Sequence, residues 1–181
     1  MVTDTIRMIT PDNFVTTIAG LAGAPGSADG TGSAARFNRP ASVAVGRGGY
    51  VYVADANNYT IRQVTPAGVV TTVAGLAGVS GSADGTGSAA RFGYPLGLAI
   101  DQNNNLYIAD DLNFTVRKMT PARNVTTLAG SPGAYGLVDG IGPAARFAIV
   151  DGIAVDSSAN IYVADLMSFP PSHIRIGVPA E

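Results

Sequence analysis

The sequence contains no cysteine, a single histidine (His173) and a single lysine (Lys118) among its 181 residues. Without cysteine the chain has no disulfide and no thiolate metal site, and it gives no indication of a redox compartment. One histidine is too few for a zinc site built on imidazoles, and it accompanies no serine in a nucleophile motif. These absences argue against zinc-dependent and nucleophilic catalysis.

Basic residues are also scarce, because eleven lysines and arginines face thirteen acidic residues, for a net charge of −2. This balance excludes a broad basic surface, so we expect neither nucleic acid nor a membrane as a partner. The first residues lack the basic start and apolar run of a signal peptide, and no run of about 18 apolar residues is present. We expect a soluble chain whose compartment stays open, an extracytoplasmic parent protein included.

Apolar residues are abundant, at 46% of the chain against 13% charged, so the chain can bury a sizeable core. One eleven-residue stretch organises it: residues 27–37 return as 82–92 and, with more changes, as 137–147. The aspartate at the third position of this stretch recurs every 55 residues. A fixed period of this size predicts a repeat protein in which each copy buries its apolar face against the next.

Each repeat holds four runs typical of β-strands, rich in valine, isoleucine and threonine and separated by turn formers. The first run of each copy is short and apolar on both faces, which is typical of an innermost strand. We therefore predict an all-β fold, a β-propeller of four-stranded antiparallel blades, with about three blades and no long helix. The runs are residues 5–11, 14–20, 42–45, 50–55, 61–66, 70–75, 97–100, 106–110, 116–121, 125–130, 152–155 and 161–165.

The chain is expected to be one repeat domain, residues 1–181. In the third copy Pro170 and Pro171 fall where a strand should begin, and the Ile-Arg pair comes about three residues late, at Ile174. The predicted parts are an outer-strand hairpin (1–20), two blade repeats (21–75 and 76–130) and an incomplete third repeat (131–181).

A recurrent signature joins a proline, an apolar inner strand, an aromatic-aliphatic-Ala-Asp run, an asparagine and an aliphatic-Arg pair. It occurs at Pro40, 42–45, 52–55, Asn58 and 61–62, and again at Pro95, 97–100, 107–110, Asn113 and 116–117. This signature resembles the NHL repeat of bacterial β-propeller proteins, which are distantly similar to gluconolactonase-like propellers. The resemblance implies the fold but no single activity, since NHL propellers include binding scaffolds as well as enzymes.

Three blades leave the propeller open, because closed propellers use roughly 4 to 8. An open arc would expose the apolar faces of its end blades. Either the chain is part of a longer propeller, or two copies form a six-bladed ring. We favour a homodimer closed by strand exchange, in which residues 14–19 of one copy complete the last blade of the other. Residues 5–10 and 174–178 then compete for one position, and the sequence leaves the outcome open.

Two sets of charged residues recur once per repeat. One set lies in the long loop, which has about twenty residues. It could form a ring of arginines, or of Asp–Arg pairs, that captures an anionic ligand. We favour the alternative that these residues tie the loop to the blade. A set on the strands is placed for a network of charge and hydrogen bonds at the blade edge. The loop set is Asp29, Asp84 and Asp139 with Arg36, Arg91 and Arg146. The strand set is Asp55, Asp110 and Asp165 with Arg62 and Arg117.

The loop also contains Gly30–Ala35, which matches a dinucleotide-binding fingerprint in letters only. That fingerprint works between a strand and a helix of a parallel unit, whereas this one lies within a loop between antiparallel strands. We expect instead a turn at Asp29-Gly30 and a short helical turn formed by Ala34, Ala35 and Phe37, which pins the loop to the blade edge.

Asp151 is the best single candidate for a functional site. It stands just before the third inner strand, where the earlier copies have Ala41 and Leu96, so it would place a carboxylate at the mouth of the central channel. In the gluconolactonase-like propellers that the chain resembles, a divalent metal occupies that channel. The resemblance therefore implies that Asp151 from two protomers could pair around calcium or magnesium, which prefer oxygen ligands.

Taken together, the residues favour a non-catalytic propeller scaffold that binds a protein, a glycan or a small ligand, or that serves in assembly. The alternative is a metal-dependent hydrolase or lyase of the gluconolactonase-like type with a site in the central channel. No cofactor is expected apart from that calcium or magnesium.

Overall fold

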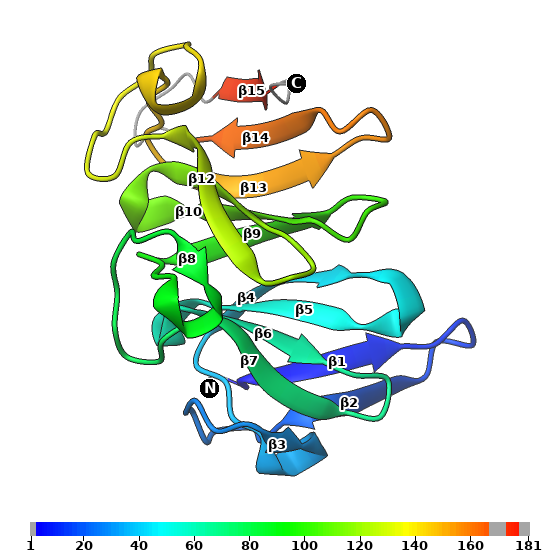
Figure 1. Ribbon diagram of the computed structural model, residues 1–181. Helices are drawn as coiled ribbons and strands as arrows, with labels where there is room; N and C mark the ends of the chain where they lie inside the picture. Colours follow the sequence, from blue (N-terminus) through cyan, green and yellow to red (C-terminus); the bar gives the residue numbers. More distant parts are fainter. Residues whose placement is uncertain (1–2, 167–172, 178–181) are drawn as a thin grey trace.

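In the computed structural model, residues 3–166 and 173–177 are described, and they form four antiparallel sheets (Figure 1). The described residues contain no α-helix, only single turns of 3-10 helix, so the all-β prediction is confirmed. No helix in this part of the chain is long and apolar enough to cross a membrane.

The sheets follow the chain in order, and each is named here by its place. The first sheet pairs β1 (Thr5–Ile9) with β2 (Val15–Gly20). The second has the order β3 (Gly30–Thr31), β7 (Val69–Gly75), β6 (Thr60–Val64), β5 (Val51–Asp55) and β4 (Pro40–Val45). The third has the order β8 (Gly85–Thr86), β12 (Asn124–Gly130), β11 (Thr115–Met119), β10 (Leu106–Asp110) and β9 (Pro95–Ile100). The fourth has the order β13 (Val150–Val155), β14 (Ile161–Asp165) and β15 (His173–Gly177).

The second and third sheets have five strands rather than the four expected. The extra strands, β3 and β8, are two residues long and belong to the long loop, which folds back and pairs with β7 and β12. A single turn follows each of them, η1 (Gly32–Ala34) in the first copy, and beyond it Ala35 and Phe37 are fully buried. A short helical turn is therefore present, but it ends at Ala34, which is exposed, and Ala35 and Phe37 just beyond it hold the loop against the sheet. Gly30, expected in a turn, begins β3 instead.

The sheets stack in sequence order, and Figure 1 shows them rising from the blue hairpin to the orange fourth sheet. The strand β9 contacts β4 on one side and β13 on the other, which agrees with the inner position predicted for the first strand of each copy. Ala44 and Ala99 on these strands are buried. At Gly97 a Cβ atom would lie 2.1 Å from the backbone oxygen of Asp151, so β9 and β13 approach too closely there for any side chain.

Three hydrophobic clusters fill the junctions between consecutive sheets. Phe37, Phe92 and Phe147 each contribute a buried ring to one junction. Each sheet thus buries a face on the next, as the repeat period predicts. The clusters contain Ile6, Ala19, Val53 and Val64; Ala54, Ile61, Leu98 and Ile108; and Ala99, Val116, Ile161 and Val163.

The irregular third copy keeps the strand register of the others. Arg175 on β15 pairs with Val163 on β14, as Arg117 pairs with Ile108 and as Arg62 pairs with Val53. The late Ile-Arg pair therefore reaches the usual position. Pro170 and Pro171, which fall between the two strands, lie outside the described residues.

Both strands that were expected to compete are formed within one chain. The strand β1 pairs with β2 in the first sheet, and β15 pairs with β14 in the fourth.

Candidate functional site

The repeated arginine on the third strand of the second and third sheets, Arg62 on β6 and Arg117 on β11, is a structural clamp. Arg62 is fully buried and donates hydrogen bonds to Asp29 Oδ1 at 2.7 Å and to Asp55 Oδ2 at 2.8 Å. It also donates to the backbone oxygens of Ala28 at 3.0 Å and Arg36 at 2.9 Å. One guanidinium group therefore joins the long loop to the second strand of its own sheet.

The second copy repeats this clamp. Arg117 bonds Asp84 Oδ1 at 2.8 Å and Asp110 Oδ2 at 3.0 Å and is likewise fully buried. Burial raises the pKa of Asp110, and hydrogen bonds from Tyr94 N–H and Asn113 and the charge of Arg117 act in the opposite direction. The arginines and the strand aspartates of the clamp are buried inside the sheet, whereas the loop aspartates Asp29 and Asp84 stay about half exposed and use their carboxylates to hold the loop.

In the first two copies the loop aspartates pair with the clamp arginines rather than with the loop arginines. In the first copy Asp29 bonds Arg62 and Thr72, while Arg36 donates to the backbone oxygens of Ser33 at 2.6 Å and Ala35 at 2.8 Å. In these two copies the clamp arginine, 33 residues away in the chain, binds the loop aspartate instead. The other loop arginines make the same backbone bonds, Arg91 to Ser88 and Ala90, and Arg146 to Pro143 and Ala145.

The residues that differ between copies gather elsewhere, at the start of the inner strands. Asp151 is exposed at the beginning of β13. Beside it lies Asp111, whose carboxylate accepts a hydrogen bond from the N–H of Val150. Burial raises the pKa of Asp111, the Val150 bond opposes that, and the charges of Asp151 and Asp110 raise it further. Two carboxylates from neighbouring sheets therefore lie close enough for their charges to interact.

Asp111 was not predicted from the sequence, although a signal was present. The first copy has Ala56 at this position and the third has Leu166, so Asp111 breaks the repeat just as Asp151 does. Comparing every position across the copies, rather than the inner strands alone, would have found it.

Two further residues extend this site toward the second sheet. The guanidinium carbon of Arg39 lies 5.7 Å from the ring centroid of Tyr94, a cation–π contact. Tyr94 in turn accepts the N–H of Asp111 at its backbone oxygen, at 3.1 Å. Arg39, Tyr94, Asp111 and Asp151 thus form a connected series across three sheets, which we call the variable rim.

Arg39 has a backbone unlike that of its counterparts. Its φ is +56°, in the left-handed region that non-glycine residues rarely adopt. Its N–H donates to Asp4 Oδ1 at 2.9 Å, whereas the N–H of Tyr94 donates to Asp110 and that of Ile149 to Asp165. The chain therefore uses a separate aspartate to hold Arg39 in place.

The variable rim offers two carboxylate acceptors, one guanidinium donor and one aromatic ring. Calcium takes six to eight oxygen ligands, and magnesium demands a near-octahedral set. Within residues 3–166 and 173–177 no three histidine, cysteine, aspartate or glutamate side chains come together. The carboxylates of the rim therefore do not by themselves make a metal site.

A family model for the NHL repeat matches residues 37–64, which cover β4, β5, β6 and the turns between them. The chain contains an NHL repeat. Among curated proteins, NHL repeat-containing protein 2 of Bos taurus is 32% identical over 125 residues, covering 64% of this chain and 17% of that protein. This NHL-repeat chain spans less than a fifth of the length of the curated relatives it matches.

Solved structures agree on the fold. A Bacteroides thetaiotaomicron protein of unknown function gives a TM-score of 0.75 at 23% identity, covering 90% of this chain and 40% of that one. An auxiliary nutrient binding protein from the same organism gives 0.68 at 20% identity, covering 91% and 41%. Virginiamycin B lyase from Staphylococcus aureus gives 0.57 at 15% identity, covering 99% and 50%. At these identities the likeness establishes an NHL β-propeller fold and no more.

Proposed function

We propose that this chain is a non-catalytic propeller scaffold that binds a small polar ligand at the variable rim. One observation carries the proposal: the recurring arginines and their aspartate partners hold the long loops, whereas four residues that differ between copies, Arg39, Tyr94, Asp111 and Asp151, lie close together near the start of the inner strands. A repeated residue serves a need that every copy has, and a residue found in one copy only is free to serve a ligand.

The chemistry of the rim favours a ligand that carries hydroxyl or amino groups. The carboxylates of Asp111 and Asp151 accept hydrogen bonds, the guanidinium of Arg39 donates them, and the ring of Tyr94 offers an apolar face. A glycan presents this mixture of groups. The auxiliary nutrient binding protein of similar fold supports binding as a use of such a scaffold, although fold alone does not decide function.

Glycan binding is tested with labelled protein on a glycan array, followed by calorimetry with the strongest glycan found. Asp151→Ala should weaken binding by roughly tenfold or more, because a hydrogen bond to a charged group contributes about 1.5–3 kcal/mol. Asp12→Ala is the control, since Asp12 is an exposed carboxylate in the turn between β1 and β2, at the opposite end of the strands. Equal affinity of the Asp151→Ala variant and the unmodified chain would contradict the proposal.

The second candidate is a metal-dependent hydrolase or lyase. The paired carboxylates of Asp111 and Asp151 favour it, as does the fold shared with virginiamycin B lyase. Calcium or magnesium chloride should then raise the melting temperature, and Asp151→Ala should abolish the rise, because a ligand stabilises the state that binds it. An unchanged melting temperature at saturating concentrations of either ion would remove this candidate.

We also propose that two copies close into a six-bladed ring. The hairpin of β1 and β2 would supply the outer two strands of a blade, and β13 and β14 of the other copy would supply the inner two. Two-fold symmetry then covers both ends of both arcs at once. Binding at the variable rim does not depend on this closure.

A further inference from the structure

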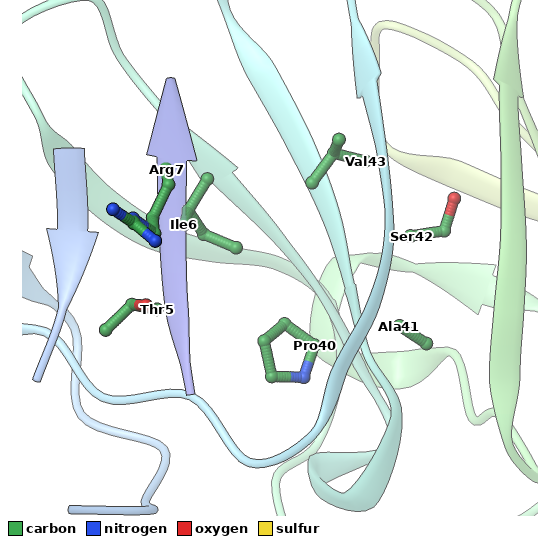
Figure 2. Close-up of a pocket in the computed structure, with 7 residues that line it drawn as sticks. All are labelled: Thr5, Ile6, Arg7, Pro40, Ala41, Ser42 and Val43. Carbon is green, nitrogen blue, oxygen red and sulfur yellow. The ribbon is translucent and has the colours of Figure 1, made fainter. Parts of the chain in front are cut away.

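A groove lies between β1 and β4, where the second sheet is only half covered. Thr5, Ile6 and Arg7 line one side, and residues 40–43 line the other. Figure 2 shows Ile6 and Val43 projecting into the space between the two strands, while Ser42 points away from it. In the described part of the chain, β1 has a strand partner on one edge alone, β2, so its other edge faces the groove.

Apolar side chains of β4 are exposed to solvent on this side of the second sheet. Val43 is 51% exposed and Val45 is 63% exposed, although Val53 on the neighbouring strand is fully buried. The counterpart of Val43 in the third sheet, Leu98, is only 7% exposed, because the second sheet covers it. The inner half of the second sheet therefore lacks a covering that the repeat normally provides.

The opposite end of the stack exposes a surface of small residues. Gly152 and Ala154 on β13 are both exposed. Their counterparts on β9 are Gly97 and Ala99, which are buried at the junction with the fourth sheet. At that junction Ile153 and Val155 pack against the cluster that contains Ala99.

The junction of β9 and β13 therefore shows which surface fits the groove. At this junction the small residues of β9, Gly97 and Ala99, pack against the branched residues of β13, Ile153 and Val155. Val43 and Val45 stand in the repeat where Ile153 and Val155 stand, and Gly152 and Ala154 stand where Gly97 and Ala99 stand. A single chain thus carries both halves of this junction unused, one half at each end.

Charged residues at the two ends of the chain are also complementary. Arg7 on β1 lies 55 residues before the clamp residue Arg62, yet it is exposed. The partner of Arg62 on the second strand of its sheet is Asp55, and the equivalent residue on β14 is Asp165. A strand pair like β13 and β14, placed in the groove, would bring such an aspartate to Arg7.

We infer that the groove between β1 and β4 receives β13 and β14 of a second copy of this chain. Gly152 and Ala154 of that copy lie on Val43 and Val45, and its Asp165 binds Arg7. In this arrangement β1 takes the place beside β14 that β15 occupies within one chain, at the same register, so β15 of that copy leaves the edge of β14. The inference rests on the ring proposed above and assigns its contacts.

The test is the solution mass, measured by light scattering on a sizing column, of the unmodified chain and two variants. The unmodified chain should have twice the monomer mass. Gly152→Ala should yield monomers and a dimer dissociation constant roughly a hundredfold higher, since overpacking acts at two symmetric junctions. Arg7→Ala should also weaken the dimer, by roughly tenfold or more, because it removes the guanidinium that binds Asp165 across the junction.

Gly152→Ala should leave the single chain folded. In one chain a Cβ atom at this position meets only Ala164 Cβ, at 3.4 Å, which is ordinary contact. Circular dichroism checks the fold, and Ser157→Ala in the exposed turn between β13 and β14 is the matched control.

The outcomes separate the two proposals. A monomeric unmodified chain overturns both the ring and this inference. A dimer that Gly152→Ala and Arg7→Ala leave unchanged overturns the assigned contacts alone. Loss of the dimer in both variants, with an intact fold and a dimeric Ser157→Ala control, supports the inference.

Discussion

Replacing Arg117 with methionine is expected to lower the free energy of unfolding by about 3–5 kcal/mol. The methylene groups are largely replaced, but Asp110 stays fully buried and loses its cation. The loop also loses its attachment, because Arg117 joins Asp84 to the sheet. Since small proteins are stable by about 5–15 kcal/mol, this change removes a large share of the total. Urea unfolding, followed by circular dichroism, measures it.

Lys118→Met is the control for this variant. Lys118 is the next residue on β11, only partly buried, and its Nζ lies 5.8 Å from the ring centroid of Tyr107. Its replacement should change stability by no more than about 0.5 kcal/mol. Adding Asp110→Asn to Arg117→Met should recover part of the loss, because no unpaired charge then remains buried. Similar stability of the Arg117→Met and Lys118→Met variants would show that the clamp is not needed.

Phe92→Ala should cost about 3–5 kcal/mol, the usual range for a buried ring cut back to a methyl group. Phe92 is 0% exposed and belongs to the cluster between the second and third sheets. It also carries the end of the long loop, so the cavity would loosen the loop and the junction together. Thermal and urea unfolding both report the change.

Phe14→Ala provides the matched comparison, because Phe14 is 67% exposed and its removal leaves no cavity. Its effect should stay within about 0.5 kcal/mol. Arg117 lies over the ring of Phe92, 5.4 Å from its centroid, so the two large effects should be coupled. The double variant should lose less stability than the sum of the single losses. Strict additivity would mean that ring and guanidinium act independently.

The strands of this fold could be predicted from sequence because their information is local. Runs of branched residues between turn formers, repeated every 55 residues, indicate where each strand lies and which copies correspond. The two-residue strands β3 and β8 could not be predicted in this way. Their pairing depends on where the long loop lies against β7 and β12, which is a tertiary contact.

Some features of the candidate site could likewise be predicted from the sequence, and others could not. Asp151 was predictable because it replaces small or apolar residues of the other copies. The partner of Asp29 was not, because Arg36 is near in sequence whereas Arg62 is near in space. Nor could the contact between Arg39 and Tyr94 be predicted, since it joins residues of two different sheets. The repeat period shows which positions differ between copies, but only the folded structure shows which of those residues are in contact.

The clamp has an evolutionary consequence. Every bond that Arg62 and Arg117 make to an aspartate or a loop carbonyl stays within one 55-residue period, while the junctions between periods are filled by apolar clusters. A tandem duplication or deletion of one period would therefore keep each buried ion pair intact and would create only another junction of the same kind. Such a gene can change the length of its product in whole units, without inventing a new interface at each step.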